Sequence, residues 1–118
     1  MTLSGIVLDS PDAQELAAFY HRLLGWTVIK EEAGWVMLGA PNGGPGLSFQ
    51  TEPDYQRPVW PAHPGDPQMH VHLDIEVADL EAAGAHAEKA GATLADFQPQ
   101  ADVRVYIDPA GHPFCLFL

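Results

Sequence analysis

The chain has one cysteine, few basic residues and no long apolar run, and each shortage excludes a class of protein. The single cysteine, Cys115, excludes an internal disulfide framework and a zinc cluster made of cysteines. Five lysines and arginines stand against sixteen aspartates and glutamates, so the net charge is −11. Phosphate contacts dominate nucleic-acid affinity, so we expect no nucleic-acid partner and no anionic membrane partner. No run approaches the roughly 18 apolar residues of a membrane span.

The composition that remains is typical of one folded domain. The chain has 118 residues, of which 47% are hydrophobic, so it can form a packed core over residues 1–118. The stretch "MTLSGIVLDSPD" has neither a basic segment nor a long apolar segment, so we expect no signal peptide. We therefore expect a cytoplasmic protein.

The first half of the chain reads as one strand, one helix and three further strands. The strand "SGIVLD" precedes a helix with an apolar face, for which Ser10 is the predicted N-cap and Gly25 the predicted stop. The segments "WTVIKEE", "WVMLGA" and "GLSFQTE" then read as strands separated by glycine-containing turns. This order predicts a βαβββ unit.

The second half repeats that order. The strand "MHVHLDIEV" precedes a helix that Asp79 can cap and Gly91 can end, and "ATLADFQ", "VRVYID" and "PFCLFL" follow as strands. The two helix-ending glycines lie 66 residues apart, and the turn glycines Gly44 and Gly111 lie 67 apart. Two landmarks that agree on the offset predict a duplicated unit.

The duplication divides the chain into module one at residues 3–52, a connecting loop at 53–67 and module two at 68–118. The loop is rich in proline and has no hydrophobic periodicity. It can be a stiff linker between the modules, a loop over a ligand site, or both at once. Trp60 within it is apolar enough to cover a pocket.

The segment "MHVHLDIEV" has two different faces. Side chains of a strand alternate, so His70, His72, Asp74 and Glu76 point one way and the aliphatic residues point the other way. Two histidines and two acids on one face are compatible with a metal site or a catalytic cleft. They are equally compatible with an ordinary solvated sheet face.

Several segments resemble one known superfamily. "LAAFYHRLLGW", "HLDIEVADLEAA" and "DPAGHPFCLFL", together with the repeat, resemble the vicinal oxygen chelate superfamily over essentially the whole chain. Its members include glyoxalase I, bleomycin-resistance proteins and extradiol dioxygenases, and the small bacterial glyoxalase-like proteins are the most similar subgroup. The resemblance implies an α+β fold, in which two βαβββ modules form a curled mixed β-sheet cup with helices on the outer face. It also implies a homodimer.

The resemblance further implies where a metal ion would be held. The superfamily's ligand positions fall on Gly5, on Ser48 (or Gln50 with a two-residue shift), on His72 and on Cys115. Only His72 is a usual ligand, and Cys115 is a possible thiolate. We therefore expect no cofactor. The alternative is one divalent ion (Zn, Ni, Co, Mn or Fe) held around His72.

The same positions supply the candidate site residues. His72 is a candidate metal ligand or general base, or simply a pocket-lining histidine. Cys115 is a candidate nucleophile if His72 activates it, or else a small buried residue. The candidate ligand-binding residues are Ser48, Gln50, Trp60, His70 and Arg104. Arg104 could hold an anionic group or pair with a surface acid, and the sequence does not settle which face of its strand it occupies.

These observations lead to three hypotheses of function. The first is a metal-independent protein that binds a small organic molecule, aromatic or cationic, in the cup. The second is a lyase, isomerase or dioxygenase with a metal ion around His72. The third is a module that acts through a protein partner. Whether the chain is an enzyme stays open, because proteins of one fold carry out unrelated chemistry.

Overall fold

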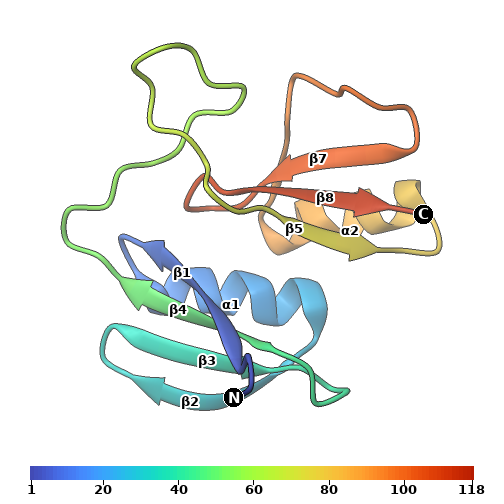
Figure 1. The fold of residues 1–118 in the computed structure, drawn as a ribbon. Helices are drawn as coiled ribbons and strands as arrows, with labels where there is room; N and C mark the ends of the chain where they lie inside the picture. The colour runs from blue at the N-terminus through green and yellow to red at the C-terminus, as the bar shows by residue number, and fades with distance from the viewer. The chain divides into compact units, whose positions relative to one another are not determined.

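The computed structural model describes residues 1–118, which form two compact units, Met1–Tyr55 and Gln56–Leu118. Each unit holds one helix and four strands in the order βαβββ (Figure 1), which confirms the α+β fold of two modules. The elements are β1 (Gly5–Ser10), α1 (Ala13–Leu24), β2 (Thr27–Glu32), β3 (Trp35–Gly39), β4 (Gly46–Thr51), β5 (Leu73–Glu76), α2 (Leu80–Ala90), β6 (Thr93–Leu94), β7 (Val103–Ile107) and β8 (Pro113–Phe117).

The first unit is a mixed sheet with α1 against one face. The strand order is β1-β4-β3-β2, with β1 parallel to β4 and the other neighbours antiparallel. The core lies between sheet and helix, where the rings of Tyr20 and Phe49 stack with centroids 5.4 Å apart. Helix α1 contacts β1, β3 and β4, so its apolar face accounts for the buried side of this sheet.

The N-cap of α1 is Asp12, which corrects the prediction of Ser10. The Asp12 carboxylate accepts hydrogen bonds from the backbone N–H groups of Gln14 and Glu15, at 3.0 and 3.2 Å. Ser10 is instead the last residue of β1, where it pairs with Thr51. The predicted ends of both helices are confirmed, since Gly25 and Gly91 follow them directly.

The second unit repeats the arrangement with the strand order β5-β8-β7-β6 and with β5 parallel to β8. Asp79 caps α2 as predicted. The rings of Tyr106 and Phe114 stack with centroids 6.0 Å apart, and Leu116 is buried beside them. Helix α2 contacts β6, β7 and β8, so one face of this sheet is covered by the helix and the other is not.

Two strands of the second unit are shorter than the sequence predicts. Only Leu73–Glu76 of "MHVHLDIEV" is a strand, because His72 would next face Pro113 of β8, which has no N–H to donate. Of "ATLADFQ" only Thr93–Leu94 is a strand. Beyond it, the Gln98 side chain takes the place of a strand partner: its amide exchanges two 2.9 Å hydrogen bonds with the Val105 backbone.

None of the helices has both the length and the apolar character needed to cross a membrane.

Candidate functional site

Three ionisable side chains meet on the second sheet, on the face away from α2. Asp74 of β5 and Cys115 of β8 are direct partners in the parallel register. His72 lies just before β5, and its Nε2 is 3.3 Å from Oδ1 of Asp74. One nitrogen, one oxygen and one sulfur atom of these residues all lie within 4.8 Å of one another. We call His72, Asp74 and Cys115 the β5–β8 triad.

Strand alternation explains why these side chains share a face. Phe114 and Leu116 are buried on the α2 side, so Cys115 between them points to the other side. The triad lines a hollow of about 280 Å³, which Gln100, Asp102 and Phe117 also line. Sequence reasoning missed Gln100 and Asp102, because they lie in an irregular segment without periodicity.

The electrostatics of the hollow favour a protonated thiol. Burial raises the pKa of Cys115, and the nearby negative charge of Asp74 and a hydrogen bond from the thiol to its carboxylate raise it further. A cysteine nucleophile needs the opposite environment, one that stabilises the thiolate. Cys115 is therefore a hydrogen-bond donor at neutral pH, and the structure gives no support to a nucleophilic role.

The charge of the hollow is acidic. Asp74 and Asp102 line it, whereas no lysine or arginine does, and His72 is the one basic group. His72 and Asp74 are both exposed to solvent, so water can reach the triad. The hollow can accept hydrogen bonds from a ligand and balance a positive charge.

The structure separates Arg104 from this hollow. Arg104 pairs with Leu116 in the antiparallel register, so its side chain lies on the α2 face, opposite Cys115. It borders a hollow with α2 residues, and its Nη1 donates to the carbonyl oxygens of Ala101 and Val103, at 2.8 and 2.9 Å. The structure therefore places Arg104 on the α2 face, a point that the sequence left open, and its role as a ligand-binding residue stays a prediction.

His70 is exposed and does not line the hollow of the triad. It precedes β5 by three residues, outside the part of the segment that pairs with β8. The predicted face of two histidines and two acids thus contributes His72 and Asp74 to the hollow.

Ser48 and Gln50 belong to the first unit. Both lie on β4 and pair with Met37 and Trp35 of β3, on the sheet face away from α1. Phe49 between them packs on the opposite face against Tyr20. Ser48 is buried and Gln50 is half-buried. Gly5, which would carry the superfamily's first ligand, has no side chain at all.

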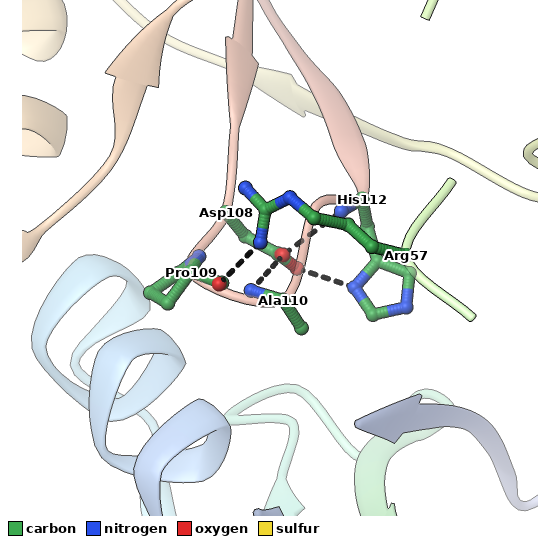
Figure 2. Close-up of polar contacts among 5 residues, drawn as sticks. All are labelled: Arg57, Asp108, Pro109, Ala110 and His112. Atoms are coloured by element: carbon green, nitrogen blue, oxygen red, sulfur yellow. Dashed lines mark hydrogen bonds and ion pairs between the residues drawn. The ribbon is translucent and has the colours of Figure 1, made fainter. Parts of the chain in front are cut away.

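Trp60 packs on the second unit at a different place from the triad. Its ring lies 5.8 Å from that of Phe97, centroid to centroid, and borders a separate hollow. Arg57 anchors the same proline-rich segment, because its Nη1 donates to the carbonyl oxygen of Pro109 at 2.8 Å (Figure 2). Residues 57–60 are therefore docked on the second unit and are not a free linker.

A buried Asp–His pair holds the turn between β7 and β8. The Asp108 carboxylate accepts from the backbone N–H groups of Ala110 and His112, at 2.9 Å each, and its Oδ2 is 2.7 Å from Nδ1 of His112 (Figure 2). The Asp108 side chain is fully buried. This arrangement stabilises the "DPAGH" turn that leads into β8, and so positions Cys115.

The four positions that the resemblance assigns to a metal ion would not supply a full ligand set, because Gly5 has no side chain and Ser48 is not a usual ligand. The β5–β8 triad is a different set, drawn from the second unit alone. An imidazole, a carboxylate and a thiolate are all ligands of zinc. The triad is compatible with an ion provided that Cys115 loses its proton.

Known proteins share this architecture. The family model described as "Glyoxalase-like domain" matches residues 5–117. A glyoxalase/bleomycin resistance protein/dioxygenase family enzyme from Burkholderia phytofirmans PsJN is similar in structure, with a TM-score of 0.74 at 17% identity over 98% of this chain and 97% of that one. A possible glyoxalase from Bacillus cereus has a TM-score of 0.71 at 13% identity, over 100% and 99%.

A glyoxalase family protein from Enterococcus faecalis is also similar, with a TM-score of 0.70 at 20% identity over 97% of this chain and 94% of that one. No curated protein matches the chain. Identities this low show the shared fold only, whereas the family model spans nearly every residue of both modules. The chain belongs to the glyoxalase-like domain family, within the vicinal oxygen chelate superfamily.

Proposed function

We propose that this protein binds a small organic molecule in the hollow of the β5–β8 triad, without the four-ligand metal set of its superfamily. The observation that carries the proposal is the meeting of His72, Asp74 and Cys115 on the sheet face away from α2, around a hollow of about 280 Å³. The thiol and the imidazole offer donors, and the carboxylate accepts. These groups can orient a polar ligand while Phe117 contacts its apolar part.

The acidic lining supports a ligand that is cationic or rich in hydrogen-bond donors. Asp74 and Asp102 would attract such a molecule, and the net charge of −11 would increase its rate of encounter. A ligand anion would meet two carboxylates and no arginine or lysine. Ser48, Gln50, Trp60, His70 and Arg104 do not line this hollow, and their role as ligand-binding residues stays a prediction.

A ligand screen tests the proposal. Matched pairs of small aromatic amines and aromatic acids are titrated into the protein, and binding is followed by the shifts of backbone amide NMR signals. Saturable shifts at residues 72–76 and 113–117 with the amines support the proposal. Asp74→Asn should weaken amine binding, whereas Glu81→Gln, on α2 and outside this hollow, should not. Absence of saturable binding at these strands would refute it.

The second candidate function is a metal-dependent lyase, isomerase or dioxygenase, with a divalent ion on the triad. The observation that favours it is the proximity of the three ligand atoms, all within 4.8 Å. Ligand atoms at 2.0–2.3 Å from a zinc ion lie roughly 3.5 Å from one another. The three side chains would therefore need to move only slightly closer together to bind an ion. Three protein ligands also leave a position for substrate, as in catalytic zinc sites.

Metal stoichiometry separates the two candidates. Untagged protein is exposed in turn to Zn, Ni, Co, Mn and Fe(II), unbound ions are removed, and metal per chain is counted by mass spectrometry. One ion per chain, lost in His72→Ala and kept in His70→Ala, would support the metal site. Both variants remove an exposed histidine, so a difference between them shows that the position of the histidine matters for the ion. No retained ion would support the metal-independent reading.

We also propose that the chain forms a homodimer, as the resemblance implies. Exposed apolar residues such as Ile29, on the edge strand β2, support this proposal. Light scattering after size-exclusion chromatography tests it directly. A mass of twice 12.8 kDa is expected, and a monomer mass at micromolar concentration would contradict it.

A further inference from the structure

The second unit carries another hollow, which shares no lining residue with that of the triad. It has a volume of about 340 Å³ and lies where the proline-rich segment meets β6 and the residues after it. This volume falls at the small end of ligand pockets, so it suits a molecule about the size of an amino acid. The residues that define it are Arg57, Trp60, Leu94, Asp96, Phe97 and Ile107.

Two aromatic rings form its apolar wall. The rings of Trp60 and Phe97 have centroids 5.8 Å apart and are inclined by 43° to each other. Phe97 remains 52% exposed and Leu94 44% exposed, although both are large apolar side chains. The indole N–H of Trp60 has no hydrogen-bond partner within the chain. The rings therefore offer an exposed apolar surface and a free donor to a ligand ring.

One cation and one anion border the same hollow. Arg57 is held in place from two sides: its Nη1 donates to the Pro109 carbonyl oxygen at 2.8 Å, and its side chain lies against Gly111, which has no Cβ in the way. The remaining N–H groups of the guanidinium are left for a ligand. Asp96 makes no ion pair, so its carboxylate is also available.

We propose that this hollow is a binding site for a small aromatic zwitterion, such as a free aromatic amino acid. The ligand ring packs on Trp60 and Phe97, its carboxylate pairs with Arg57, and its ammonium group pairs with Asp96. A simple aromatic acid would pair with Arg57 but be repelled by Asp96. An aromatic amine would pair with Asp96 but be repelled by Arg57. Only a molecule with both charges satisfies both groups.

The site goes beyond the function proposed for the triad, and it does not depend on it. An aromatic amino acid has about 12 non-hydrogen atoms, and a ligand of this size with the binding efficiency usual for small organic molecules has a Kd on the order of 1 mM. The shifts of backbone amide NMR signals detect binding of this strength and also show which hollow is occupied.

The test uses L-phenylalanine as the probe and three analogues that each lack one feature. 3-Phenylpropionate lacks the ammonium group, 2-phenylethylamine lacks the carboxylate, and L-leucine lacks the ring. At residues 57–60 and 93–97, which border this hollow, L-phenylalanine should bind saturably and more tightly than each analogue. Trp60→Leu should weaken its binding about tenfold through loss of the aromatic contact.

Asp96→Asn provides the decisive variant, because it lies on an exposed segment and leaves the fold intact. It should weaken L-phenylalanine binding about two- to fivefold and strengthen 3-phenylpropionate binding, so that the preference between them narrows or reverses. Glu31→Gln, which removes one exposed carboxylate on β2 of the first unit and outside both hollows, is the control and should change neither.

Three results would overturn the proposal. The first is absence of saturable L-phenylalanine binding up to about 20 mM, well above the expected Kd. The second is equal or tighter binding of either single-charge analogue at this hollow of the unaltered protein, read from the amide signals of residues 57–60 and 93–97. The third is an Asp96→Asn variant that prefers L-phenylalanine over 3-phenylpropionate by the same factor as the unaltered protein. Each of them is read from amide signals of residues that line this hollow and not that of the triad, so failure here and failure of the proposed function are distinguishable.

Discussion

Asp74 and Cys115 lie directly opposite each other on the parallel strands β5 and β8, so the carboxylate faces the thiol. Burial is the main cause of the raised pKa of Cys115, and Asp74 adds to it. Asp74→Asn removes a negative charge beside the thiol, so it should lower this pKa while burial still keeps it above the ordinary value.

The pH dependence of alkylation of Cys115 by iodoacetamide measures that change, because only the thiolate reacts. Near neutral pH, Asp74→Asn should react faster than the unaltered protein. Glu76→Gln is the matched control: it removes a carboxylate two residues along β5 that does not contribute to the Cys115 shift. An Asp74→Asn variant with an unchanged or slower rate at pH 7 would contradict the assignment.

Zinc affinity of the triad, if the ion binds there, should rise with pH. Cys115 must lose its proton to become a ligand, and its raised pKa makes that loss unfavourable at neutral pH. Below the thiol pKa, affinity should increase by about tenfold per pH unit. Competition titrations with a chelator between pH 6 and 8 measure the slope. Cys115→Ser should flatten it, and an equal slope in that variant would argue that the thiol is not a ligand.

Gly84 of α2 leaves space for the Tyr106 hydroxyl. A Cβ at position 84 would lie 2.5 Å from Oη of Tyr106, which donates to Glu88 at 3.2 Å. Gly84→Ala should therefore destabilise the protein by about 1–2 kcal/mol, despite the better helix propensity of alanine. Urea unfolding gives the free energy of each variant.

Removal of the hydroxyl should relieve that clash. In a Tyr106→Phe background, Gly84→Ala should lower the free energy of unfolding by clearly less, because the hydroxyl oxygen nearest to the new Cβ is gone. Gly44→Ala is the control in open space and should change stability by less than about 0.5 kcal/mol. Equal costs of Gly84→Ala in both backgrounds would show that the clash with Tyr106 is not the cause.

Asp108→Ala should strongly destabilise the second unit. The buried carboxylate accepts from the N–H groups of Ala110 and His112 and contacts the His112 ring, and the substitution leaves these donors unpaired. A loss of about 2–4 kcal/mol is expected from urea unfolding. The exposed Asp102→Ala is the control, with little change expected. A small effect at Asp108 would mean that water replaces the carboxylate.

Much of the fold could be predicted from local sequence signals. Gly25 and Gly91 end the two helices as expected, and Asp79 caps the second. The N-cap of α1 was missed because Ser10 is also a good capping residue, and only its pairing with Thr51 places it in β1. The shortened β5 was missed because its end depends on Pro113, about forty residues away in the chain.

The candidate site was predicted less completely. Strand alternation placed His72 and Asp74 on one face, and the resemblance placed Cys115 near His72, as the structure has them. The face of Arg104 depends on its register with Leu116, which no local pattern reveals. Asp102 comes from an irregular segment and gave no signal, whereas Phe97 lies in a segment that was predicted to be a strand and is irregular beyond Leu94.

The sequence by itself determined the duplicated βαβββ order, the acidic charge and the weakness of the inherited metal positions. These depend on residue type and on spacing along the chain, since Gly5 can supply no side chain in any fold. Only the tertiary structure decided that Asp74 joins His72 and Cys115, that Arg104 lies on the opposite face, and that Trp60 meets Phe97 elsewhere. Each of these depends on the register between strands or on loop docking, which is set by contacts between residues distant in sequence.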